Sequence, residues 1–198
     1  MPAYAHPRFH PSRSTRARAA IVAIGLGSLL VGPVRAADNA SPVTVARGAY
    51  LVHAMGCADC HTPLKMGAKG PEPDLSRGLS GHPQGMVLQA PAATAGSAWT
   101  WGGSATNTAF WGAWGVSYAA NLTPDATGLK AWTAEQFTQA MRTGRHAGNG
   151  RPLMPPMPWP AFGQLNDADL HAMFVYLMAQ PAVPNPVPAY QPPDAAKR

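Results

Sequence analysis

The feature that most constrains this chain is a short run, Cys57-Ala58-Asp59-Cys60-His61, which holds both cysteines of the sequence. Cysteines three positions apart on one helical turn project to the same side. Their sulfurs can therefore bond covalently along one edge of a porphyrin, while the histidine that follows reaches the metal at its centre. The run predicts covalent attachment of one c-type haem through Cys57 and Cys60, with His61 as an iron ligand.

Three other uses of a cysteine pair fit the sequence less well. A thioredoxin-like redox pair follows a strand and opens a βαβ unit, whereas Cys57 follows a helical pattern. A structural zinc site needs a second pair of ligands, and the chain has no further cysteine. A local disulfide between Cys57 and Cys60 would leave His61 without a role. Haem attachment is therefore the interpretation that uses all three residues.

Helix periodicity and end signals predict three main helices, at residues 41–56, 133–144 and 166–180. Ser41 can cap the first, and Asn166 stands where a cap of the third is needed. Thr133 and Gln136 form a capping-box pattern, and Gly144 is a typical helix stop. These patterns predict an all-α fold.

Residues 62–122 separate the first two predicted helices and have neither helical nor strand periodicity. The segment is rich in Gly, Pro, Ser and Thr, and it contains four of the six tryptophans. Sixty residues without structure are improbable in a compact domain unless another component organises them. We therefore expect a long irregular insertion that is ordered by the large planar cofactor.

The ends of the chain differ from its middle in composition. Residues 1–36 carry five of the fifteen Lys and Arg side chains and no Asp or Glu. An apolar stretch over 19–31 precedes Val34-Arg35-Ala36, which predicts a signal peptide cleaved after Ala36. The alternative is an uncleaved anchor, for which the apolar stretch is short, since spanning helices need about 20 residues. We expect a signal peptide over 1–36, one domain over 37–180 and an extended Pro-rich tail over 181–198.

The charge of the chain gives little support for a nucleic-acid partner. The formal net charge is +6, but residues 37–198 hold ten basic and nine acidic side chains. The excess therefore belongs to the N-terminal segment. We expect the mature chain to bind no nucleic acid, to have no membrane span and to be periplasmic.

A second iron ligand decides between an electron carrier and a haem enzyme. Four prolines surround Met157 in residues 153–160, and such a segment forms neither helix nor strand. It can nevertheless hold a thioether rigidly against a haem face, and thioether ligation raises the reduction potential. We favour Met157 as the sixth ligand and keep Met154 as the alternative. Ligation by a second histidine is a further alternative, with four candidates outside the C-x-x-C-H run: His53, His82, His146 and His171.

The order of these elements resembles a class I cytochrome c. The segment Asn121-Leu122-Thr123-Pro124-Asp125 and the run Pro156-Met157-Pro158-Trp159 are similar to those of cytochrome c subunits that serve bacterial periplasmic dehydrogenases, and of their mono-haem relatives. The resemblance covers most of residues 45–180. It implies about three main helices around one haem, supports Met157 as the ligand, and implies that a small residue packs on an aromatic where the first and last helices cross. Candidates for that contact are Gly48, Tyr50, Phe174 and Tyr176.

The function expected from these observations is single-electron transfer, not catalysis. The partners are then a periplasmic dehydrogenase or other redox protein as donor, and a downstream cytochrome or terminal oxidase as acceptor. Two alternatives stay open: a haem enzyme or small-molecule sensor with a labile sixth ligand, and a non-catalytic assembly subunit. Two supporting contacts are also expected from spacing. Pro71 or Pro73 would accept a hydrogen bond from His61, and haem propionates would meet Arg142, Arg145 or Arg151.

Overall fold

The computed structural model describes residues 41–91 and 98–193. Its α-helices are α1 (Pro42–Ala54), α2 (Cys57–His61), α3 (Ala134–Thr143), α4 (Trp159–Phe162) and α5 (Asp167–Met178). Its strands are β1 (Leu64–Gly67), β2 (Gly70–Pro73), β3 (Trp101–Gly103), β4 (Ala109–Gly112) and β5 (Gly115–Tyr118). Short 3₁₀ turns are η1 (Leu75–Arg77) and η2 (His146–Gly148). The predicted signal peptide over 1–36 lies outside the described residues.

The ends of the three main helices are set by local signals. Ser41 caps α1 by accepting a hydrogen bond from the Thr44 amide, and Asn166 caps α5 in the same way. Thr133 and Gln136 complete a reciprocal capping box at α3. At the other end of α3, Gly144 adopts φ 65°, a left-handed conformation that favours glycine. The three predicted helices are therefore confirmed.

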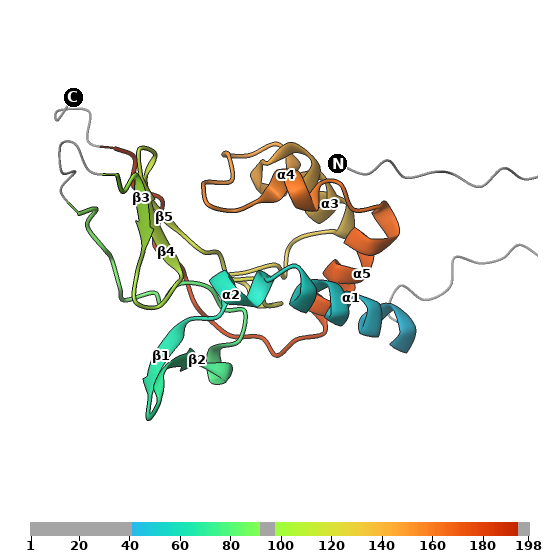
Figure 1. Cartoon of the computed structure of the whole chain (residues 1–198). Helices are drawn as coiled ribbons and strands as arrows, with labels where there is room; N and C mark the ends of the chain where they lie inside the picture. Colours follow the sequence, from blue (N-terminus) through green and yellow to red (C-terminus); the bar gives the residue numbers. More distant parts are fainter. Residues whose placement is uncertain (1–40, 92–97, 194–198) are drawn as a thin grey trace, which may run out of the picture. The chain divides into compact units, whose positions relative to one another are not determined.

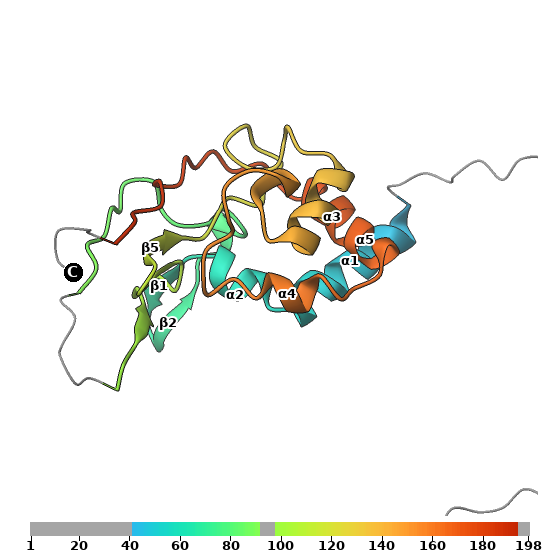
Figure 2. The same cartoon turned by 90° about the horizontal axis from the view of Figure 1, so that it is seen from above.

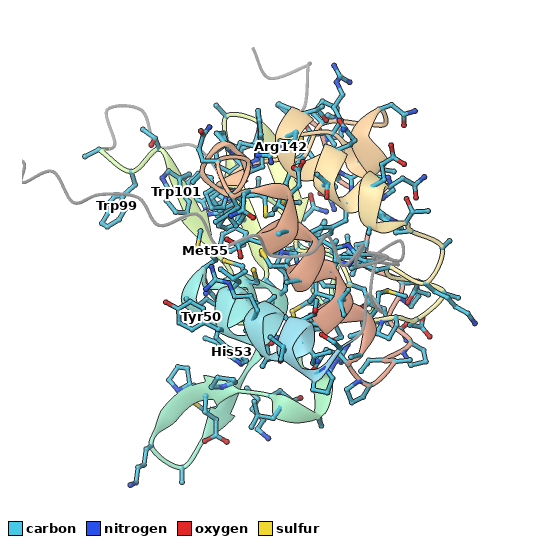
Figure 3. All side chains as sticks on the ribbon, turned by 90° about the vertical axis from the view of Figure 1, so that its right-hand side faces the viewer. Tyr50, His53, Met55, Trp99, Trp101 and Arg142 are labelled. Atoms are coloured by element: carbon cyan, nitrogen blue, oxygen red, sulfur yellow. The ribbon has the colours of Figure 1, made fainter. Side chains whose placement is uncertain are left out.

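Helices α1 and α5 lie side by side in two perpendicular views (Figures 1 and 2). They meet at Gly48, where a Cβ atom would be 1.9 Å from the carbonyl oxygen of Ala172 and 2.7 Å from Cβ of Tyr176. The expected crossing at a small residue therefore involves Gly48 and Tyr176. Tyr50 does not take part, because it is 62% exposed and projects from α1 away from α5 (Figure 3).

One buried apolar cluster joins the helices to the insertion. Its members come from α1, α3, α4, α5 and two loops: Leu51, Val52, Leu79, Leu129, Phe137, Ala140, Met141, Phe162, Leu170, Met173, Phe174 and Leu177. The rings of Phe137 and Phe174 lie 5.8 Å apart within it. Phe174 of α5 thus packs on Phe137 of α3.

The expectation of an all-α fold is wrong. Strands β1 and β2 form an antiparallel hairpin directly after α2, and β3, β4 and β5 form an antiparallel sheet in that order. Each strand has only three or four residues, and β2 contains a glycine and two prolines. Strands this short show no alternation that could be recognised beforehand. The insertion therefore contains two small sheets, joined by segments without regular structure in its described part.

The Pro-rich tail is extended and is attached to the insertion over its described part. The backbones of Gln191 and Val116 exchange two hydrogen bonds, of 2.8 and 2.9 Å, beside β5. Asn185 is 0% exposed, and its side-chain amide donates to the carbonyl oxygens of Ser80 and His82. Its oxygen accepts from the Gln84 amide at 3.0 Å. The tail therefore fixes the loop that follows the first hairpin.

Candidate haem site

The three residues of the attachment motif share one helical turn. Gly56 precedes α2 with φ 69°, a left-handed conformation that turns the chain sharply between α1 and α2. Helix α2 then carries Cys57, Cys60 and His61. Cys57 and Cys60 stand one turn apart, so their side chains leave the same face of α2.

The two thiols form no disulfide with each other and lie in surroundings that disfavour the thiolate form. Burial raises the pKa of Cys57 to about 11, and burial also raises the pKa of Cys60. A thioredoxin-like pair depends on a lowered cysteine pKa and follows a strand. Here the pair follows α1, and the pKa shifts have the opposite sign. The local structure is therefore unlike that of a dithiol redox site.

His61 is held in the tautomer that a metal ligand needs. The ring is 8% exposed, and its Nδ1 lies 2.7 Å from the carbonyl oxygen of Ala120. A carbonyl only accepts, so Nδ1 carries the hydrogen and Nε2 keeps its lone pair. Burial lowers the pKa of His61, which favours the neutral ring. Such a bond orients a ligating imidazole and increases its basicity.

The partner of His61 differs from the one that spacing suggested. Pro71 and Pro73 belong to β2 and pair with Met66 and Leu64 of β1, so neither receives the His61 hydrogen bond. The acceptor, Ala120, lies 59 positions after His61, where the insertion ends. It directly precedes the Asn121-Leu122-Thr123-Pro124 segment. No local sequence signal identifies this contact, because it depends on how the whole insertion folds back.

Residues 153–158, here called the methionine loop, lie between α3 and α4. Leu153 donates a backbone hydrogen bond to Gly144 at 2.8 Å, which fixes the start of the loop. Met157 is half-buried and packs against the same apolar cluster as Cys57. Met154 is also half-buried but is not among the side chains that pack against that cluster. The contrast supports Met157 as the side chain associated with the haem helix, although ligation itself stays a prediction.

The other histidines have different surroundings. Both ring nitrogens of His82 are engaged, with Thr108 Oγ1 at 2.8 Å and the Met86 carbonyl at 2.7 Å. His53 is exposed on α1 and contacts the Ala49 carbonyl (Figure 3). His146 packs edge-on against Trp132, with ring centres 4.8 Å apart. None of these contacts places a second imidazole beside His61.

The arginines proposed for propionates also have partners. Arg142 forms an ion pair with Asp167 at 2.7 Å and bonds the carbonyl of Gly163. Arg145 donates to the Gly150 carbonyl, and Arg151 to the Pro152 carbonyl. These bonds lie at the surface. They give no support to a role in binding the cofactor.

The residues present fit a covalently bound haem. The motif supplies two thiols on one face, a neutral imidazole with a free lone pair, and a thioether on the same apolar cluster. Large apolar side chains of that cluster, including Leu79 and Phe137, provide the kind of surroundings that exclude water from a porphyrin.

Comparison with known proteins supports the same conclusion. The chain is 30% identical to the gluconate 2-dehydrogenase cytochrome c subunit of Pantoea cypripedii over 159 residues, which cover 80% of this chain and 28% of that protein. It is 29% identical to the cytochrome c subunit of the quinone alcohol dehydrogenase of Gluconobacter oxydans, over 79% of this chain and 25% of the relative.

A third relative matches more strongly over a shorter stretch. This protein, a nicotinate dehydrogenase subunit of Pseudomonas putida, is 42% identical over 91 residues, which cover 46% of this chain and 7% of the relative. The chain thus spans between about a fourteenth and somewhat over a quarter of the length of these three relatives. The sequence model of the Cytochrome c family matches residues 45–181, and with more than half of the chain covered, the protein belongs to the Cytochrome c family.

Proposed function

We propose that this protein is an exported electron carrier with a single haem c, attached to Cys57 and Cys60 and ligated by His61 and Met157. The observation that carries the proposal is the state of His61. It shares one turn with both cysteines, and its Nδ1 hydrogen is committed to the Ala120 carbonyl. Nε2 is therefore the nitrogen available to iron.

Each residue has a distinct task in this proposal. Cys57 and Cys60 hold the group covalently, so it is not lost on reduction. His61 and Met157 would both bind the iron, which would leave no open position for external ligands. When bound, the haem iron takes up and releases one electron at a time. A site with both axial positions filled rearranges little when its charge changes, which suits a carrier better than an enzyme.

The proposed partners follow from the relatives. Several of them are named as cytochrome subunits of gluconate, alcohol and fructose dehydrogenases. We infer a dehydrogenase as electron donor and a downstream cytochrome or terminal oxidase as acceptor. The N-terminal segment over 1–36 supports export to the periplasm. In the described part of the chain, no helix combines the length and apolarity of a transmembrane segment.

The test of this function is Met157→Ala, with Met154→Ala as its matched control. An oxidised haem with a methionine ligand has a weak far-red absorption band from the sulfur–iron bond. Met157→Ala should abolish this band and lower the reduction potential of the haem by about 0.1 V or more. The variant protein should also bind cyanide readily. Covalent haem should remain, because both cysteines are intact.

Met154→Ala should leave the band and the potential nearly unchanged. The opposite pattern would transfer the ligand role to Met154 and keep the carrier function. If the unmutated oxidised protein lacks the band and binds cyanide rapidly, the carrier function is wrong. The protein would then be a haem enzyme or a sensor with a labile sixth ligand.

A further inference from the structure

The methionine loop has few internal hydrogen bonds that could hold it in place. Prolines at 155, 156, 158 and 160 have no amide hydrogen to donate. Within the loop, the Met157 amide bonds the Met154 carbonyl at 3.3 Å, a long contact. Leu153 is fixed upstream, and α4 begins at Trp159 downstream. The position of Met157 therefore depends on contacts made by other parts of the chain.

Such a contact comes from strand β5. Ser117 is 6% exposed, and its hydroxyl donates to the carbonyl oxygen of Pro155 at 2.6 Å. In the described part of the chain, this is the hydrogen bond that reaches residues 154–157 from another element. Pro155 stands two positions before Met157. Because proline rings fix φ at 155, 156 and 158, a constraint on this carbonyl is passed on to the Met157 backbone.

The surroundings of Ser117 favour a hydrogen bond from its hydroxyl to the Pro155 carbonyl over one to the Phe110 carbonyl. The Phe110 carbonyl lies farther away, at 3.4 Å, and a hydroxyl has a single hydrogen to give. Trp114 Nε1 donates to Ser117 Oγ at 3.2 Å and so occupies a lone pair of the oxygen. The Trp114 carbonyl in turn accepts the Tyr190 hydroxyl of the tail. The sheet and the tail thus orient the hydroxyl toward Pro155.

We propose that Ser117 is a positioning residue for the axial methionine, and that the β3–β5 sheet serves to hold the methionine loop over the haem site. The inference rests on the proposed ligation by Met157. It gives the insertion a function within the electron carrier: the sheet decides how readily the sixth ligand detaches from iron.

The experiment uses holoprotein carrying Ser117→Ala, with imidazole as the external ligand probe. Losing one hydrogen bond from the methionine-bound state should tighten imidazole binding about fivefold. The far-red band should weaken and the reduction potential should fall, while the haem stays attached. Ser117→Thr keeps the hydroxyl and should restore all three properties. Ser104→Ala is the matched control, because the Ser104 hydroxyl accepts from the Ala109 amide of the same sheet.

The outcomes separate this proposal from the function on which it rests. If the unmutated protein lacks the far-red band, ligation by Met157 fails whatever the serine variants do. If the band is present but Ser117→Ala matches Ser104→Ala in imidazole affinity, Ser117 has no positioning role. If Ser117→Ala fails to retain haem, the contact between Ser117 and Pro155 is tested instead by proton NMR of the unmutated reduced protein. Overhauser contacts between Ser117 and the Pro155–Pro156 protons are expected, and their absence overturns the proposal.

Discussion

Replacing Gly48 by alanine tests the crossing of α1 and α5, next to α2, the helix that carries the attachment motif. In an isolated helix this change would be favourable by about 1 kcal/mol, since glycine is a poor helix former. In the folded protein the new Cβ would lie 1.9 Å from the Ala172 carbonyl oxygen and 2.6 Å from its carbon. Real Cβ atoms essentially never approach other atoms closer than 3.0 Å. Helices α1 and α5 must therefore separate by about 1.1 Å.

The cost of that separation can be set against the gain in helix propensity. The obstructing atoms are backbone, which cannot rotate away as a flexible side chain would. A gap of this size removes a quarter to a half of the dispersion energy of each affected contact. We therefore take the upper end of the overpacking range, about 3 kcal/mol. After the gain of about 1 kcal/mol, the net loss in the free energy of unfolding is about 2 kcal/mol.

The assay is thermal unfolding of the oxidised holoprotein, followed by far-ultraviolet circular dichroism. A loss of about 2 kcal/mol should lower Tm by about 4–8 °C in a domain of this size. Gly85→Ala is the control, because a Cβ at Gly85 would meet nothing within 4 Å. An unchanged or raised Tm for Gly48→Ala would show that the helices do not meet as closely as described.

Two further changes test the buried polar contacts of the insertion. Burial lowers the pKa of His82 below its ordinary value of 6.5, so the unfolded chain binds the proton more tightly. The contribution of His82 to the free energy of unfolding should therefore be fully present above pH 6.5 and be lost below it, by at most about 1.4 kcal/mol per pH unit. Urea unfolding of His82→Gln should show a flatter pH profile than that of the unmutated protein. Asn185→Ala should lower the free energy of unfolding by about 3 kcal/mol, because it leaves buried carbonyls of Ser80 and His82 unpaired. The exposed Asn149→Ala should change it little, and equal urea midpoints for the two variants would contradict this reasoning.

The helices could be predicted because their signals are local. A cap, a capping box and a glycine stop act within four or five residues, and α1, α3 and α5 end close to where those residues stand. The attachment motif is local in the same sense, since Cys57 and His61 belong to one turn. For these helices and for the attachment motif, pattern and structure therefore agree.

The sheets could not be predicted because their strands are too short, and in β2 too rich in glycine and proline, to show a strand pattern. Strand β2, with the sequence Gly-Pro-Glu-Pro, has almost no intrinsic preference for a strand, and it forms because β1 pairs with it. Strand β5 pairs with β4, and one of its residues also exchanges hydrogen bonds with Gln191, 75 positions later in the chain. Strand β3 lies at the edge of its sheet, and Trp99 and Trp101 near it are 82% and 49% exposed (Figure 3).

The same contrast explains which parts of the haem site were missed. The side chains expected to bind the cofactor are readable as motifs, but the groups that we propose orient them are a backbone carbonyl at Ala120 and a serine hydroxyl on β5. The family match ends at residue 181, before the last part of the tail. In that part, the Tyr190 hydroxyl donates to the Trp114 carbonyl. The next residue, Gln191, exchanges backbone hydrogen bonds with Val116 of β5. Ser117 follows directly. Hydrogen bonds thus lead from the tail through β5 to Pro155, so if Ser117 positions Met157 as we propose, the insertion and the tail form one support for the sixth ligand.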